Sequence, residues 1–168
     1  MSLNEPEALL RDLGGLLTER GWMLACAESC TGGLLSAALT ELPGSSVWFE
    51  RGFVTYSNAA KMQHLRVSAD TLERFGAVSE ETAMEMAAGV LAEVRDAQFA
   101  ISTTGIAGPG GATPGKPVGM VCFGFARRAA DGIVTRAAVK IFEGGRGEVR
   151  RSAVDYALRT ALEFIAQR

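Results

Sequence analysis

The spacing of apolar and polar residues predicts a chain in which helices and strands alternate. Apolar residues recur every three or four positions, with polar residues between them, in six segments: residues 6–20, 34–39, 58–65, 69–75, 79–94 and 150–165. Ser57, Ser68 and Ser79 precede three of these predicted helices and are expected to cap them. Short β-branched, aromatic or apolar runs predict strands at 52–56, 98–102, 118–126 and 133–142.

The order of these elements indicates the fold class. Helices and strands alternate early in the chain, and residues 130–132 join the last two predicted strands as a hairpin. We therefore expect an α/β protein with a mixed sheet and helices on both faces of that sheet.

Residues 23–33 form the most informative stretch. An apolar run ends in small polar residues and two glycines, and the helix predicted at 34–39 follows at once. This pattern is typical of a strand, a tight turn and a helix. The turn brings Ser29, Thr31 and free backbone N–H groups together, and such groups attract anions or developing negative charge. We expect the chemistry where this strand ends.

A loop rich in glycine and proline is expected over residues 103–117. Residues 110–117 fit the spacing of a phosphate-binding P-loop, except that Pro117 stands where Ser or Thr should hold Mg²⁺. A strand is predicted after the loop, where a P-loop requires a helix. Both departures argue against an ATP site and favour a loop that approaches a ligand closely.

Composition narrows the class of protein. The 168 residues suit one domain, residues 1–168, and 48% hydrophobic residues with 21% charged residues indicate a packed core. A net charge of −2 argues against sequence-independent binding of nucleic acid. Three cysteines make a disulfide framework improbable, and neither a signal peptide nor an apolar stretch of membrane-spanning length is present. We expect a cytoplasmic protein.

The scarcity of histidine and lysine limits the chemistry. His64 is the only histidine, and Cys26 and Cys30 lie four apart across a strand-to-helix change, so we expect neither a metal site nor a His-based triad. A nucleophile would need a lysine as its base. Lys61, on the helix that begins after Ser57, should point back over a strand end, where burial would lower its pKa. An ordinary solvated lysine is the alternative.

The nucleophile itself stays open at this point. Ser29 and Ser46 are the serines nearest to predicted strand ends, although they also suit a helix cap and a turn. Cys30 suits either a thiolate at a helix start or a small buried residue. Glu28 suits a ligand-orienting carboxylate or a solvated one.

Basic residues gather before and within the last predicted helix. Arg146, Arg150 and Arg151 suit either a phosphate site or a solvated helix start. The second interpretation is weakened because positive charge at a helix start opposes the helix dipole.

Several motifs in a fixed order together resemble one family. They are residues 27–33 (AESCTGG), 44–46 (GSS), 53–58 (FVTYSN), Lys61, 76–79 (GAVS), 104–111 (TGIAGPGG) and 116–119 (KPVG). They closely resemble the CinA C-terminal domain family, the nicotinamide mononucleotide deamidases, from about Leu9 to the C-terminus.

The resemblance implies a three-layer α/β/α fold with a mixed, mostly parallel sheet. It implies hydrolysis of nicotinamide mononucleotide to nicotinate mononucleotide and ammonia, in pyridine-nucleotide recycling, by a serine–lysine mechanism. It implies a small-molecule substrate, no metal and no organic cofactor, and it is compatible with a homo-oligomer. No nucleic acid or membrane partner is expected.

The resemblance and the residue chemistry together predict the site. The predicted catalytic residues are Ser29, Ser46, Tyr56 and Lys61, and the predicted substrate-binding residues are Glu28, Thr31, Gly32, Gly33, Thr104, Gly105 and Arg146. Arg146 lies in a Gly144-Gly145-Arg146 sequence where the family has Gly-Asp-Arg. The main alternative is a catalytically idle nucleotide-binding or regulatory module connected with competence or the response to DNA damage.

Overall fold

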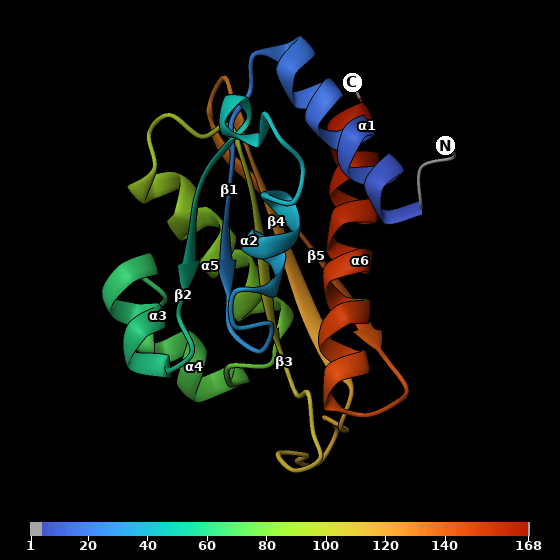
Figure 1. Ribbon diagram of the computed structural model, residues 1–168. Helices are drawn as coiled ribbons and strands as arrows, with labels where there is room; N and C mark the ends of the chain where they lie inside the picture. Colours follow the sequence, from blue (N-terminus) through green and yellow to red (C-terminus); the bar gives the residue numbers. More distant parts are fainter. Residues whose placement is uncertain (1–4, 168) are drawn as a thin grey trace.

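Five strands form one sheet between two layers of helices in the computed structural model, which describes residues 5–167 (Figure 1). The strands are β1 (Leu24–Glu28), β2 (Phe49–Val54), β3 (Phe99–Gly105), β4 (Met120–Ala129) and β5 (Gly132–Ile141). The helices are α1 (Glu5–Arg20), α2 (Leu34–Leu39), the short 3₁₀ turn η1 (Ser45–Val47), α3 (Asn58–Leu65), α4 (Ala69–Phe75), α5 (Glu80–Glu93) and α6 (Arg146–Ala166). The predicted domain, 1–168, also includes residues 1–4 and 168, which lie outside the described residues, and it stays a prediction.

The strand order is β2-β1-β3-β4-β5, and the sheet is mixed, as expected. β2, β1 and β3 run parallel, whereas β3–β4 and β4–β5 are antiparallel pairs. The expectation of a mostly parallel sheet is therefore wrong, because a loop and the predicted hairpin, rather than crossover helices, join the last three strands. The carboxyl ends of β1, β2 and β3 meet at one edge of the sheet.

Each face of the sheet has its own apolar core. On one face, α1, α2 and α6 cover side chains such as Leu24, Ile101 and Phe123. On the other face, α5 covers Ala25, Ala27 and other small residues, and α3 and α4 pack on α5. Burying a large apolar side chain stabilises a fold by about 1.5–3 kcal/mol, so these two cores fix the sheet and the loops at its edge.

Three serine caps confirm the predicted helix starts at the second layer. The hydroxyl oxygens of Ser57, Ser68 and Ser79 accept hydrogen bonds from backbone N–H groups three residues later. Each cap satisfies a donor that the first helical turn leaves free, which is worth about 1 kcal/mol.

The boundaries of several elements differ from the prediction. β3 runs to Gly105 instead of residue 102, so the first three residues of the predicted 103–117 loop belong to this strand, and β4 runs to Ala129 instead of residue 126. β2 begins at Phe49 instead of residue 52, so Gly52 lies inside the strand. A Cβ atom at Gly52 would lie 2.1 Å from Ser36 Oγ of α2, which explains the glycine at this position. α6 begins at Arg146 instead of residue 150, with Gly145 as its N-cap. The start of β2 at Phe49 leaves Ser46 before the strand, and the start of α6 at residue 146 makes Arg146 the first residue of this helix.

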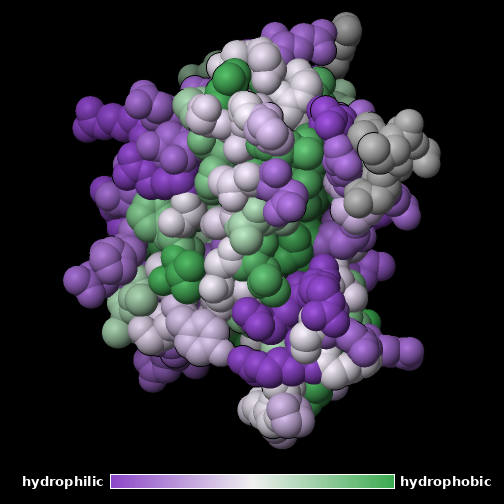
Figure 2. Space-filling view, in the orientation of Figure 1, coloured by the Kyte–Doolittle hydropathy of each residue, from purple (hydrophilic) through white to green (hydrophobic). Residues whose placement is uncertain are grey.

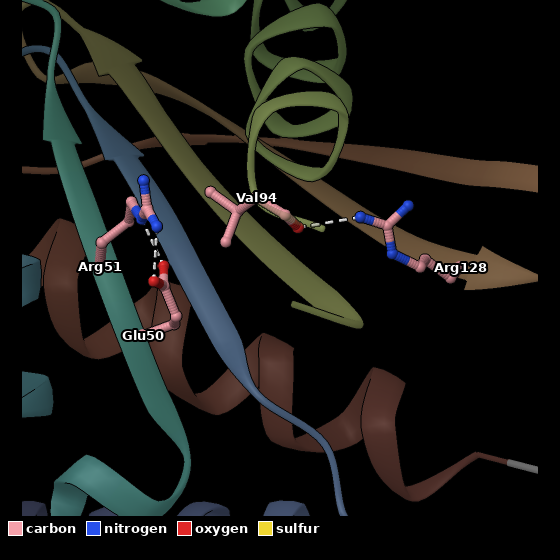
Figure 3. A network of polar contacts seen from close by, with 4 residues as sticks. All are labelled: Glu50, Arg51, Val94 and Arg128. Atoms are coloured by element: carbon pink, nitrogen blue, oxygen red, sulfur yellow. Dashed lines mark hydrogen bonds and ion pairs between the residues drawn. The ribbon is translucent and has the colours of Figure 1, made fainter. Parts of the chain in front are cut away.

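Polar contacts also lie near the amino ends of the parallel strands, at the end of the sheet opposite the carboxyl ends of β1, β2 and β3 (Figure 3). Arg128 of β4 donates to the carbonyl oxygens of Leu91, Val94 and Ala97, which closes the carbonyl end of α5. Glu50 and Arg51 of β2 form an ion pair at the surface. The Arg128 bonds tie β4 to the end of α5, whereas the exposed Glu50–Arg51 pair joins neighbouring residues of one strand and contributes little to stability.

One face of the molecule shows apolar residues gathered near its middle, between more hydrophilic flanks (Figure 2). α2 is six residues long and leaves part of β2 uncovered, so that Val54 remains 53% exposed.

Among residues 5–167, no helix combines the length and the apolar character that crossing a membrane requires. The cytoplasmic location stays a prediction.

Candidate active site

A cavity of about 320 Å³ lies at the carboxyl ends of β1, β2 and β3. The segments that follow these strands form its walls, together with the start of α6. Its lining residues are Ser29, Cys30, Tyr56, Asn58, Lys61, Ala77, Val78, Thr104, Gly105, Ile106, Ala107, Gly108, Gly110, Gly111 and Arg146. Ligands of open α/β sheets bind at this edge, where the loops after parallel strands converge.

Ser29 and Lys61 face each other in this cavity. Ser29 directly follows β1, and its N–H donates to Thr103 O at 2.9 Å, which continues the sheet and fixes the residue. Lys61 lies one turn into α3, and its Nζ donates to Ser29 Oγ at 3.0 Å and to Thr55 O at 3.0 Å. The sequence prediction that Lys61 points back over a strand end is confirmed.

The surroundings of Lys61 favour its neutral amine. The side chain is only 1% exposed, and burial lowers its pKa, an effect that the negative form of Cys30 would partly oppose. Within the described part of the chain, no carboxylate forms an ion pair with Lys61. In its neutral form the amine still donates to Thr55 O, while its lone pair faces Ser29 Oγ. The direction of the contact with Ser29 is then reversed, and the hydroxyl donates to Nζ, as a general base requires.

Cys30 is a weak candidate for the nucleophile although it lines the cavity. Burial raises the pKa of its thiol to about 11, so the thiol keeps its proton near neutral pH. Cys26 and Cys122 are buried elsewhere, and burial raises the pKa of both thiols as well.

Glu28 is directed away from the cavity. The carboxylate is fully buried and accepts hydrogen bonds from Thr31 Oγ1, from the N–H groups of Leu35 and Ser36, and from Ser36 Oγ, at 2.7–3.0 Å. It therefore caps α2 and closes the turn after β1. The structure does not bring Glu28 to the cavity lining as a substrate-binding residue, because the start of α2 takes all of its hydrogen-bonding capacity.

The remaining residues of this turn also lie behind the cavity wall. Thr31 is fully buried and bonds to Glu28 and Thr103. Gly32 and Gly33 have φ angles of 56° and 110°, a left-handed conformation that favours glycine. Thr31, Gly32 and Gly33 shape the turn, but none of them is among the residues that line the cavity.

Ser46 lies at the opposite edge of the sheet. It belongs to η1, which precedes β2, whereas Ser29 follows β1, a strand parallel to β2. The six residues of β2 separate the two edges by roughly 20 Å at about 3.3 Å per residue. The structure therefore does not bring Ser46 together with Ser29 and Lys61.

Arg146 and Tyr56 meet at the mouth of the cavity. Arg146 donates to Tyr56 Oη at 3.0 Å and to Gly108 O at 2.8 Å, so it links the segment after β2 with the glycine-rich loop. Tyr56 is 60% exposed. These two hydrogen bonds hold the Arg146 guanidinium group where an anionic part of a ligand can reach it.

Thr104 and Gly105 form the far wall, as predicted. Thr104 Oγ1 donates to Ala77 O at 2.7 Å, which ties β3 to the segment before α5. A Cβ atom at Gly105 would lie 2.7 Å from Met120 O, so only glycine fits here. Glycine at this position therefore allows β3 to pack closely against β4, which holds this wall of the cavity in place.

Sequence reasoning missed several lining residues as site residues. Asn58 is the clearest, because it lies three residues before Lys61 on the same face of α3, and its position after the Ser57 cap was a usable signal. Ala77, Val78 and Ile106 lie within the 76–79 and 104–111 motifs, but their apolar side chains gave no chemical reason to name them as site residues.

The other basic candidates have structural contacts. Lys116, from the P-loop-like segment, donates to Phe75 O at the end of α4. Arg150 donates to Cys30 O and Thr31 O, each at 3.1 Å. Arg151 is exposed and lies outside the cavity lining. Within residues 5–167, no group of three or more His, Cys, Asp or Glu residues is placed to hold a metal ion.

Comparisons with known proteins give consistent matches. The model of the CinA C-terminal domain matches residues 6–165. The nicotinamide-nucleotide amidohydrolase PncC of Enterobacter agglomerans is 52% identical over 98% of this chain and 99% of its own, and that of Escherichia coli K12 is 48% identical over 99% of both chains. A competence damage-inducible protein A from Klebsiella pneumoniae has a similar structure, with a TM-score of 0.91 and 38% identity over 98% of this chain and 99% of that chain.

Proposed function

Because the chain belongs to the CinA C-terminal domain family, we propose that it hydrolyses the carboxamide of nicotinamide mononucleotide. The products are nicotinate mononucleotide and ammonia, and the reaction would serve the recycling of pyridine nucleotides. Full-length relatives with about half of their residues identical bear the name of this activity.

The proposal rests on one observation above all, the contact between Ser29 Oγ and the buried Nζ of Lys61. A hydroxyl at its ordinary pKa is a weak nucleophile and needs an adjacent base. Burial lowers the pKa of Lys61, which increases the fraction of neutral amine that can take this proton.

The reaction then proceeds in two halves. Lys61 Nζ takes the Ser29 proton as Oγ bonds to the carboxamide carbon, and N–H groups of the turn after β1 stabilise the oxyanion. The C–N bond breaks as Lys61 gives the proton to the carboxamide nitrogen, which leaves as ammonia. A water molecule gives a proton to the same amine and adds to the acyl carbon. The bond to Ser29 Oγ then breaks, Oγ takes the proton back from Lys61, and the acid leaves.

The rest of the cavity suits a phosphorylated substrate. Its lining contains Arg146 and Lys61 but no Asp or Glu. With the reacting group at Ser29, Arg146 is the group placed at the mouth to pair with the 5′-phosphate. Asn58 offers an amide on the wall beside Lys61.

Ammonia release tests this function. The wild-type protein should release one ammonia and one nicotinate mononucleotide per nicotinamide mononucleotide consumed, measured by a coupled enzyme assay and by mass spectrometry. The unphosphorylated nicotinamide riboside should react with a much higher KM. Calorimetric binding of the mononucleotide without ammonia release would support the idle nucleotide-binding module instead.

A further inference from the structure

One buried hydroxyl group next to the active site has no hydrogen-bond partner. Among the side chains of residues 5–167, Thr55 Oγ1 is the buried nitrogen or oxygen atom that forms no hydrogen bond. Thr55 is only 1% exposed, so bulk water does not satisfy this oxygen. An unpaired buried polar group destabilises a fold, and valine would fill the same space without one. The hydroxyl therefore calls for a reason other than stability.

The register of the sheet places Thr55 beside the reacting serine. β2 and β1 pair in parallel as far as Val54 and Glu28, and the ladder continues because Thr55 N–H donates to Glu28 O at 2.9 Å. The next residues of the two strands are Thr55 and Ser29. Neighbouring strands lie roughly 5 Å apart, so these two residues are direct neighbours across the sheet.

Both side chains project from the same face of the sheet. Successive side chains of a strand alternate between the two faces. Ala27 and Phe53 belong to the core that α5 covers, so Ser29 and Thr55, each two residues later, point towards the same layer of helices. Lys61 reaches them from α3, which is part of that layer (Figure 1). The unpaired hydroxyl, the nucleophile and the base therefore share one face.

Lys61 lacks one acceptor once it has taken the serine proton. A neutral amine has two N–H groups and a lone pair, whereas an ammonium has three N–H groups and no lone pair. Among the described residues, Nζ has two hydrogen-bond partners, Ser29 Oγ and Thr55 O, each at 3.0 Å. The third N–H group of the ammonium has no acceptor in this arrangement. Leaving a donor of a buried charged group unpaired is costly, so a further acceptor would favour proton transfer.

The unpaired hydroxyl and the unpaired N–H group lie close to each other. Nζ already contacts Thr55 O, which four covalent bonds separate from Oγ1 of the same residue. The Thr55 backbone is fixed by its bond to Glu28 O, but rotation about side-chain bonds of Thr55 and Lys61 can bring Oγ1 and Nζ together. Catalytic hydrogen bonds of a free enzyme often tighten only as the reaction proceeds.

From these observations we propose that Thr55 is a positioning residue: its hydroxyl oxygen accepts the third N–H group of the Lys61 ammonium that forms as Ser29 attacks. This role rests on the proposed serine–lysine reaction. Thr55 is not among the residues that line the cavity, so it acts through Lys61 and does not touch the substrate. The same hydroxyl destabilises the resting fold and stabilises the charged state of the reaction.

The test compares Thr55→Val, which removes the hydroxyl, with Thr55→Ser, which keeps it. Loss of one hydrogen bond to a charged group typically lowers a rate by about 10- to 100-fold, and we expect Thr55→Val to lose kcat for ammonia release on that scale. KM should change by less than about threefold, because Thr55 does not touch the substrate, and Thr55→Ser should keep kcat within about threefold of the wild type.

Stability measurements separate this role from a merely structural one. Thr55→Val should keep or raise the urea midpoint, because it removes an unpaired buried hydroxyl. Thr103→Val is the matched control: Thr103 Oγ1 shares a 2.7 Å hydrogen bond with Thr31 Oγ1, so its removal should lower the midpoint. A protein that is as stable as the wild type and yet slower in the reaction is the expected result for Thr55→Val.

Two results would overturn the role of Thr55. One is folded Thr55→Val with wild-type kcat, and the other is an equal loss of kcat in Thr55→Val and Thr55→Ser. If the valine variant does not fold, Thr55→Ser and Thr55→Ala give the same comparison, because they differ only in the hydroxyl. Equal kcat in those two variants would overturn the role as well.

A fluorophosphonate probe, which labels activated serines, distinguishes failure of this role from failure of the proposed function. The rate of labelling at Ser29 should fall in Thr55→Val in parallel with kcat, because this attack also moves the serine proton to Lys61. Wild-type protein that is labelled at Ser29 but releases no ammonia from nicotinamide mononucleotide would overturn the proposed function, and the labelling rates would still decide the role of Thr55. A wild-type labelling rate in Thr55→Val would overturn that role alone.

Discussion

Replacing Lys61 with methionine should abolish activity and also stabilise the protein at neutral pH. The lysine is 1% exposed and forms no ion pair with a described carboxylate, so burial disfavours its charged form and lowers its pKa. At pH values below the folded pKa, each pKa unit of that lowering costs the folded state about 1.4 kcal/mol. Methionine has a similar shape and avoids this cost, although Thr55 O loses a donor, at about 1 kcal/mol.

The dependence of this stability difference on pH gives the sharper test. Between the lowered folded pKa and the ordinary value of 10.5, the unfolded wild type binds more protons than the folded one, so wild-type stability rises with pH. The advantage of Lys61→Met should therefore shrink as pH rises towards 10.5 and be lost above it. Below the folded pKa it should be constant.

The assays are urea unfolding of both proteins at several pH values and ammonia release at each. Groups other than Lys61 titrate in both proteins, so their contributions cancel in the difference. Loss of a general base should reduce kcat by at least about 100-fold. The reasoning would be refuted by a variant that retains turnover, or by a stability difference that does not change with pH.

Three further outcomes follow from named contacts. The acidic limb of the pH profile of kcat/KM should reflect the lowered pKa of Lys61 and lie below 10.5, and a limb at the ordinary value would show a solvated base. Glu28→Gln should lower the free energy of unfolding by about 2–3 kcal/mol in urea titrations. The substitution replaces one of two oxygens, which together accept four buried hydrogen bonds, with an NH2 group that can only donate. An unchanged urea midpoint would contradict this. Gly52→Ala should lower the free energy of unfolding by about 1–3 kcal/mol, because its Cβ atom would lie 2.1 Å from Ser36 Oγ. The control Gly15→Ala, whose Cβ atom would have nothing within 4 Å, should leave that free energy unchanged or raise it. Equal effects of the two substitutions would count against the packing argument.

Local signals predicted most of the elements and the position of the Lys61 side chain. Ser57 precedes α3, and the spacing from this cap to Lys61 sufficed to point the lysine at a strand end. The same kind of signal predicted Ser68 and Ser79 as caps. These features depend on a few neighbouring residues, so sequence spacing determines them.

Features that depend on the register and direction of strands were not predictable. Ser46 seemed close to a strand end, but only the pairing of β2 with β1 shows that this end is the remote one. Whether Glu28 faces the substrate or the start of α2 depends on which side of β1 its carboxylate lies. The contacts of Arg150 join residues about 120 positions apart, and no local pattern indicates them.

Ammonia release by Ser29→Ala and Ser46→Ala, measured beside the wild type on nicotinamide mononucleotide, tests the central claim most directly. Ser29 lies 3.0 Å from Lys61 Nζ, whereas Ser46 lies at the other edge of the sheet. We predict that Ser29→Ala loses activity by at least about 1,000-fold, as removal of a catalytic nucleophile does, and that Ser46→Ala stays close to the wild type. Wild-type turnover by Ser29→Ala, or loss of activity only in Ser46→Ala, would contradict the account.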